Sequence, residues 1–146
     1  MGVQLGGGSA ERFAGLAAAN VLTTTSQYKV VYPNGTDGTF AVADTTTAHI
    51  LAIGINQTYM SSGAASPIEV RMLGISKAIA AGTITAGDRL VASGAGLVTP
   101  ATTTNGSGTG GATSTATFNN ILGWAITGAT TAGAEVLVYV NPQIIR

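Results

Sequence analysis

Residues 28–42 read YKVVYPNGTDGTFAV, and this stretch decides the fold class. Residues 28–32 and 39–42 are rich in β-branched and aromatic side chains, which are enriched in strands. Between them, residues 33–38 consist of proline, glycine, asparagine, aspartate and threonine, a composition that favours turns. Two β-rich runs separated by a short turn cluster predict a β-hairpin.

Short runs of the same kind recur along the rest of the chain. A tight hairpin is predicted for residues 89–92 and 97–99, with SGAG as its connection. Further strands are expected over residues 49–55, 68–75, 121–127 and 135–140, and a short strand with a turn over residues 78–84. Pro142 should end the last strand, because proline cannot donate a ladder hydrogen bond. Regularly spaced strands predict an all-β fold, a small β-barrel or β-sandwich of short strands.

Residues 1–26 differ from this pattern. They begin with a glycine run at positions 6–8, which is typical of a flexible spacer. Ser9 could cap a short helix, with Phe13 and Leu16 at helical spacing behind it. So few apolar residues cannot stabilise a helix alone. We therefore predict an extended or short-helical N-terminal interaction arm over residues 1–26, and a β domain over residues 27–146 that folds without it.

Two other features concern organisation. Residues 100–118 consist mostly of Thr, Gly, Ala and Ser, and predict a flexible loop that a partner could order. Residues 50–55, ILAIGI, resemble residues 121–126, ILGWAI, and each run precedes a small-residue loop and a Glu-Val strand. This weak repeat predicts a sheet folded back on itself with pseudo-symmetry; chance similarity between low-complexity β sequences is the alternative.

The composition excludes several classes of function. Charged residues make up 8% of the chain, against about 25% in an ordinary domain, and the formal net charge is zero. A neutral chain with six Lys and Arg lacks the basic surface that binds nucleic acid. Its apolar stretches are too interrupted for a membrane span. We expect neither nucleic acid nor membrane as a partner.

Residues that could carry chemistry are sparse. The chain has no cysteine and a single histidine, His49, so thiolate and multi-histidine metal sites are excluded. His49 follows Asp44 closely, but no Gly-x-Ser-x-Gly nucleophile motif accompanies them. The glycine-rich residues 106–111 lack the lysine and the following helix of a phosphate-binding loop. We therefore expect no enzymatic activity, no catalytic residue, no cofactor and no metal ligand.

The scarcity of charge favours assembly with other proteins. A free monomer normally covers itself with Lys and Glu, whereas this chain must present Thr, Ser, Asn, Gly and Ala. Trp124 is predicted to be a core residue, with an interface anchor as the alternative. Tyr28 and Tyr32 could lie at the edge of the core or on a contact surface, and the sequence does not choose between these.

Four segments share an order of elements with a known family. They read GISKAIAAGTITAGDRLV at residues 74–91, GLVTPA at 96–101, ILGWA at 121–125 and EVLVYVNP at 135–142. This order of small residues, Gly-Asp, strand, Gly-strand-Pro, loop, Ile-Leu-Gly-x-Ala and strand resembles the head decoration, or cement, proteins of tailed bacteriophages. The resemblance implies a small β-barrel or β-tulip domain.

The resemblance also implies a function. Cement proteins are made in the host cytoplasm, bind the major capsid protein on the outer surface of the expanded head, often as trimers, and stabilise it against internal DNA pressure. We expect the same here, with a homotrimer binding the major capsid protein. The candidate contact residues are Val3, Leu5, Phe13, Leu16, Tyr28 and Tyr32. The alternative is a phage fibre or receptor- or glycan-binding module, with Tyr28, Tyr32 and Tyr59 as a stacking platform.

Overall fold

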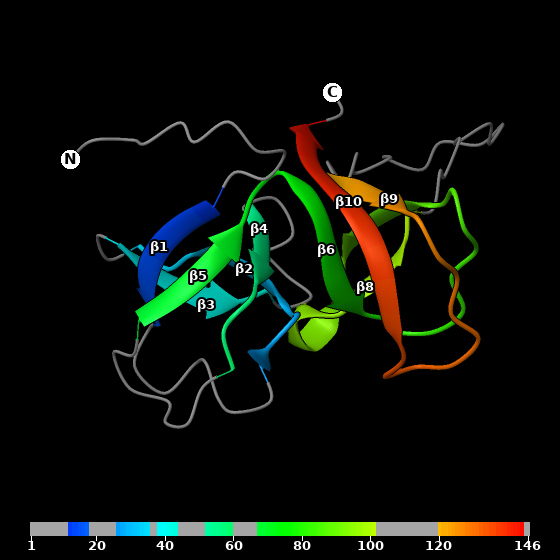
Figure 1. The fold of residues 1–146 in the computed structure, drawn as a ribbon, viewed down its shortest axis with the longest axis horizontal. Helices are drawn as coiled ribbons and strands as arrows, with labels where there is room; N and C mark the ends of the chain where they lie inside the picture. The colour runs from blue at the N-terminus through cyan, green and yellow to red at the C-terminus, as the bar shows by residue number, and fades with distance from the viewer. Residues whose placement is uncertain are drawn as a thin grey trace, which may run out of the picture.

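The fold is all-β, as the sequence predicts. A computed structural model describes residues 12–17, 26–35, 38–43, 52–59, 67–101 and 120–144 of the chain. The strands within these ranges form two groups that lie side by side (Figure 1). None of the described residues belongs to a helix long and apolar enough to cross a membrane.

The first group is a closed barrel with the strand order β1-β3-β2-β4-β5. Pairing between β1 and β5 closes it, and β1 runs parallel to β3 while the other pairs are antiparallel. Its own core is made by Val31, Phe40, Ile68 and Val70. The strands are β1 (Arg12–Ala17), β2 (Val30–Pro33), β3 (Thr39–Val42), β4 (Gly54–Asn56) and β5 (Pro67–Arg71).

The second group is a five-stranded sheet with the order β6-β10-β9-β7-β8. An isolated bridge between Ala80 and Val98 brings the chain after β6 against β8, so this sheet also curls around its core. A short 3-10 turn, η2 (Gly94–Gly96), joins β7 to β8. The strands are β6 (Gly74–Ile79), β7 (Arg89–Ala92), β8 (Val98–Pro100), β9 (Asn120–Ala125) and β10 (Glu135–Ile144).

Strand β10 shows why this sequence builds a sheet. Val136, Val138 and Val140 are buried, and the residues between them are exposed, as expected when side chains alternate across a strand. The three valines join a core that also includes Val30 and Ile55 of the barrel. The two groups of strands therefore share buried side chains rather than standing apart.

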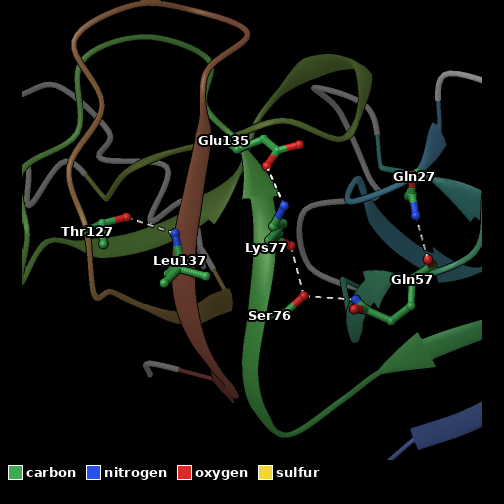
Figure 2. Close-up of polar contacts among 7 residues, drawn as sticks. All are labelled: Gln27, Gln57, Ser76, Lys77, Thr127, Glu135 and Leu137. Atoms are coloured by element: carbon green, nitrogen blue, oxygen red, sulfur yellow. Dashed lines mark hydrogen bonds and ion pairs between the residues drawn. The ribbon is translucent and has the colours of Figure 1, made fainter.

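Polar side chains reinforce this junction, as Figure 2 shows. Gln57, which follows β4, donates from Nε2 to Ser76 Oγ on β6 at 2.8 Å and to the Ile55 carbonyl at 2.9 Å. Ser76 Oγ in turn donates to the Lys77 carbonyl at 2.8 Å. Gln27 Nε2 donates to the Gln57 carbonyl at 3.1 Å. These bonds fix the barrel against the edge of the second sheet.

The N-terminal arm is predicted to be extended or short-helical, and its described part is extended. Residues 12–17 form strand β1, which pairs with both β3 and β5. Pairing on both sides satisfies the backbone N–H and C=O groups of these residues. A helix this short and weakly apolar would not be stable without such support. This part of the predicted arm is a barrel strand and does not lie apart from the β domain. Residues 1–11 and 18–25 lie outside the described residues.

Three strand boundaries also differ from prediction. Tyr28 lies outside β2, with a positive φ of 62°. The strand expected over residues 68–75 is divided between β5 and β6, and Gly74 at φ 97° follows the change of direction. β10 continues past Pro142, because the register shifts between Val140 and Gln143 and accommodates the proline. The loop predicted at residues 100–118 lies, beyond position 101, outside the described residues, as do Asp44 and His49.

Candidate interaction surface

The outward side of the second sheet carries large exposed apolar side chains. Leu137 is 38% and Tyr139 is 41% exposed on β10, and Ile75 is 54% exposed on β6. Ile126, just after β9, is 43% exposed, and its N–H donates to the Leu137 carbonyl at 2.7 Å. Apart from Tyr59, these are the exposed large hydrophobic residues of the described chain. Their concentration on one sheet makes it a candidate contact surface.

The strand register aligns several of these residues into one row. Tyr139 lies opposite Ile75 on one side and opposite Trp124 on the other, and Trp124 lies opposite Arg89. Directly opposed residues share a face of the sheet, with their Cβ atoms about 5 Å apart. We call Ile75, Tyr139, Trp124 and Arg89 the cross-strand row. It runs across β6, β10, β9 and β7.

Trp124 therefore has a different place from the one predicted. It is half-buried and lies on the outward face, while its neighbour Ala125 belongs to the core. The alternation of the strand explains this, since Ala125 is opposite the buried Val138 and Trp124 is opposite the exposed Tyr139. The prediction that Trp124 is a core residue is wrong, and its role as an interface anchor stays a prediction.

An arginine lies at each end of the cross-strand row. Arg89 is exposed on β7 at one end. Arg71, the last residue of β5, donates from Nη1 to the Ile75 carbonyl at the other end. The Nε of Arg71 is buried and has no hydrogen-bond partner in the described structure. Neither arginine has a carboxylate within ion-pair distance among the described residues.

A third cation close to the row, Lys77 on β6, is already paired. Lys77 Nζ lies 2.8 Å from Glu135 Oε2, and both side chains are about half exposed (Figure 2). The hydrogen bond and charge of Glu135 raise the pKa of Lys77 above its ordinary value. Lys77 Nζ also lies 5.4 Å from the centre of the Tyr28 ring. Glu135 is the only acidic residue of β6, β7, β9 and β10. Glu69 shares β5 with Arg71, and Asp88 directly precedes Arg89, but no ion pair joins either acid to either of these two arginines in the described structure.

The structure does not gather the predicted contact residues on this surface. Val3 and Leu5 lie outside the described residues. Phe13 and Leu16 lie in β1, opposite Val70 and Pro67 of β5. Tyr28 and Tyr32 are half-buried and pack against the larger core. A contact role for these six residues stays a prediction.

The sequence contained a signal for the surface that was missed. In residues 135–140, EVLVYV, both alternating sets of positions are apolar except for Glu135. A strand with one face in the core and one in water normally alternates apolar with polar residues. Leu137 and Tyr139 break that alternation, which indicates a second contact face. Arg89 gave no such signal, because the register that aligns it with the row is a tertiary feature. Arg71 is joined to the row by its hydrogen bond to the Ile75 carbonyl, four residues along the chain.

The described residues contain no cluster of His, Asp and Glu suited to a metal ion. What the arrangement offers is recognition, through an apolar and aromatic row with an arginine at each end. Tyr, Trp and Arg are the residue types most enriched among those that dominate binding energy at protein interfaces.

The fold is found in a phage structural protein. The chain is similar to the N base of the head fiber gp8.5 in bacteriophage phi29, known from a crystal structure. The TM-score is 0.54, and the match covers 94% of this chain and 98% of that one at 19% sequence identity. A likeness at this identity shows a common fold. No protein-family model matches the chain, and no curated protein matches it in sequence.

Proposed function

We propose that this chain is a structural protein of a bacteriophage virion that binds the outside of the expanded head through the major capsid protein. The observation that carries the proposal is the fold shared with a phage head fiber base over nearly the whole of both chains. The decoration-protein pattern of residues 74–142 supports the same placement from the sequence.

The surface chemistry supports a role in assembly. Large apolar side chains on one face of the sheet are in contact with water in the free chain, which is unfavourable. A neighbouring protein would cover them. A low density of charge reduces the cost of desolvating ions in such a contact. Contacts repeated over an icosahedral shell gain further from multivalency. We propose that the chain stabilises the head by linking neighbouring subunits, as a homotrimer and without catalysis.

A second candidate is the base of a fibre that projects from the head. The head fiber base of phage phi29 favours it, since that protein has the same fold. This function also requires attachment to the head. The two candidates differ in whether a fibre projects from the attached chain. Glycan binding by a tyrosine platform has less support, because Tyr28 and Tyr32 pack against the core while only Tyr59 is largely exposed.

Binding to purified heads tests the proposal. Expanded heads assembled without this chain are mixed with increasing amounts of it, and bound protein is measured after sedimentation. We expect saturable binding and a higher melting temperature of the decorated heads. Sedimentation equilibrium of the free chain measures the proposed trimer. Retention on host cells or glycan arrays, with no binding to heads, would replace the proposal by a receptor-binding function.

A further inference from the structure

We infer that the cross-strand row, with Arg71 and Arg89 at its ends, docks an apolar segment of the major capsid protein that carries a carboxylate on each side. The inference rests on the proposed function and assigns its contact to one surface. It places the contact on the second sheet instead of the N-terminal segment.

The residue types in the row favour a protein partner. Tyr139, Trp124 and the two arginines belong to the three types that most often dominate interface energetics. Tyr139 and Ile75 are about half exposed, so a partner can remove substantial apolar area from water at this site. Trp124 is held between Tyr139 and Arg89 by the strand register, which lowers the entropy lost when a partner docks.

The unpaired arginines define the partner's charge. A guanidinium group binds a carboxylate through two parallel N–H donors, and such bonds are stronger than neutral ones. Arg71 Nη1 donates to the Ile75 carbonyl and its Nε is buried, so a partner's carboxylate would meet the remaining N–H groups of this guanidinium. Lys77 is less available for this role, because it already contacts Glu135. The positive charge available to a partner therefore lies at the two ends of the row.

The register also sets the spacing of the partner's charges. Neighbouring strands lie about 4.8 Å apart, so the three steps from Ile75 to Arg89 span about 14 Å. An extended segment advances about 3.3 Å per residue. Arg71 lies beyond Ile75, so a segment lying across the strands would meet both arginines with acidic residues at least about four or five positions apart and apolar residues between them.

A second copy of this chain fits the row less well. A two-fold contact that stacked one row on another would bring arginine ends against arginine ends, because both ends of the row are positive. Like charges in such a contact cost binding energy, whereas an acidic segment supplies the counter-charge. The charge pattern therefore favours a different protein over self-association at this face.

Paired substitutions in the full chain test the inference. Tyr139→Ser removes an apolar group from the row, and Tyr59→Ser is its control, because Tyr59 is 67% exposed and lies outside the second sheet. Arg89→Glu reverses a charge at one end of the row, and Lys29→Glu makes the same change of charge before β2. Thermal melts and circular dichroism establish whether each variant is folded. If Arg89→Glu does not fold, Arg89→Gln replaces it.

Affinity for expanded heads is then measured at low and at moderate salt. We expect Tyr139→Ser and Arg89→Glu to weaken binding about tenfold or more, and the two controls to stay close to the unsubstituted chain. Salt should weaken binding of the unsubstituted chain more than that of Arg89→Glu. Equal binding by row variants and controls would overturn the inference while leaving head binding intact. Loss of self-association in the row variants, with head binding unchanged, would overturn it in favour of a second copy. Failure of the unsubstituted chain to bind heads would instead refute the proposed function.

Discussion

Gly123 lies where β9 passes closest to β10. A Cβ atom at this position would collide with the carbonyl oxygen of Tyr139, a backbone atom that cannot rotate away. We expect Gly123→Ala to destabilise the fold by about 1–3 kcal/mol, the usual range for overpacking. Urea denaturation measures the change. Gly82→Ala is the matched control, because nothing lies within 4 Å of its Cβ position. Equal stability of the two variants would show that the strands can separate without cost.

The buried Asn56 amide makes a second prediction at this scale. Its Nδ2 donates to the Ser26 carbonyl at 3.0 Å and to the Thr58 carbonyl at 3.1 Å, and its Oδ1 accepts from the Thr58 N–H at 3.0 Å. The residue is completely buried. Asn56→Leu would leave these backbone groups without their partner, so we expect a loss of about 2–3 kcal/mol in the free energy of unfolding.

Chemical denaturation measures the loss, with Gln27→Ala as the control. Gln27 makes a single partly buried side-chain bond, to the Gln57 carbonyl. Its removal should cost under about 1.5 kcal/mol. A smaller effect at Asn56 than at Gln27 would mean that water or a rearranged backbone replaces the lost amide.

At the scale of elements, β1 determines whether the barrel is closed. It pairs with β5 along its length and with β3 at its end, so its removal leaves two strand edges uncovered. We expect deletion of residues 1–17 to lower the unfolding midpoint strongly and to promote aggregation. Deletion of residues 1–8, which leaves β1 in place, is the control. A truncated chain as stable as the control would show that β1 is the separable arm that the sequence suggested.

How far the sequence predicts the elements depends on where their hydrogen bonds are made. The hairpin of β7 and β8 is local, with Ser93 donating to the Leu97 carbonyl at 2.7 Å, and its residues predict it directly. β1 pairs with strands far along the chain, and its own residues leave an extended arm and a short helix both open. Helical spacing over so short a segment predicts little, because a helix of this length is not stable by itself. Pairing with two neighbouring strands therefore decides its conformation.

The candidate site shows the same division. The composition predicts that the chain is built to be covered by protein, and the apolar residues on both faces of β10 were visible in the sequence. The alignment of Arg71, Ile75, Tyr139, Trp124 and Arg89 comes from five different strands. The register brings Ile75, Tyr139, Trp124 and Arg89 together, so no local pattern in the chain could have predicted the row. Arg71 adds to it through a local hydrogen bond to the Ile75 carbonyl.

For the molecule as a whole, the two groups of strands are joined by a shared core. Val30 and Ile55 from the barrel pack in the same cluster as Leu122 and Val138 from the second sheet. The predicted internal repeat is divided between the groups, since β4 pairs with β5 in one and β9 pairs with β10 in the other. The shared core makes the two halves mechanically dependent on each other.

This dependence predicts a single cooperative unfolding transition. Val31 lies in the barrel's own core and is completely buried. Trp124, the single tryptophan of the chain, lies in the second sheet. We expect Val31→Ala to destabilise the protein by about 2 kcal/mol and to shift the unfolding midpoint reported by Trp124 fluorescence as much as that reported by far-UV circular dichroism.

Tyr59→Ser is the control for this experiment, because its exposed side chain should leave both midpoints unchanged. If Val31→Ala shifts the circular dichroism transition while the fluorescence transition stays in place, the barrel unfolds independently of the second sheet. The shared core and the Gln57–Ser76 bond would then be too weak to couple them. Coincident shifts would mean that the barrel and the second sheet unfold as one cooperative unit.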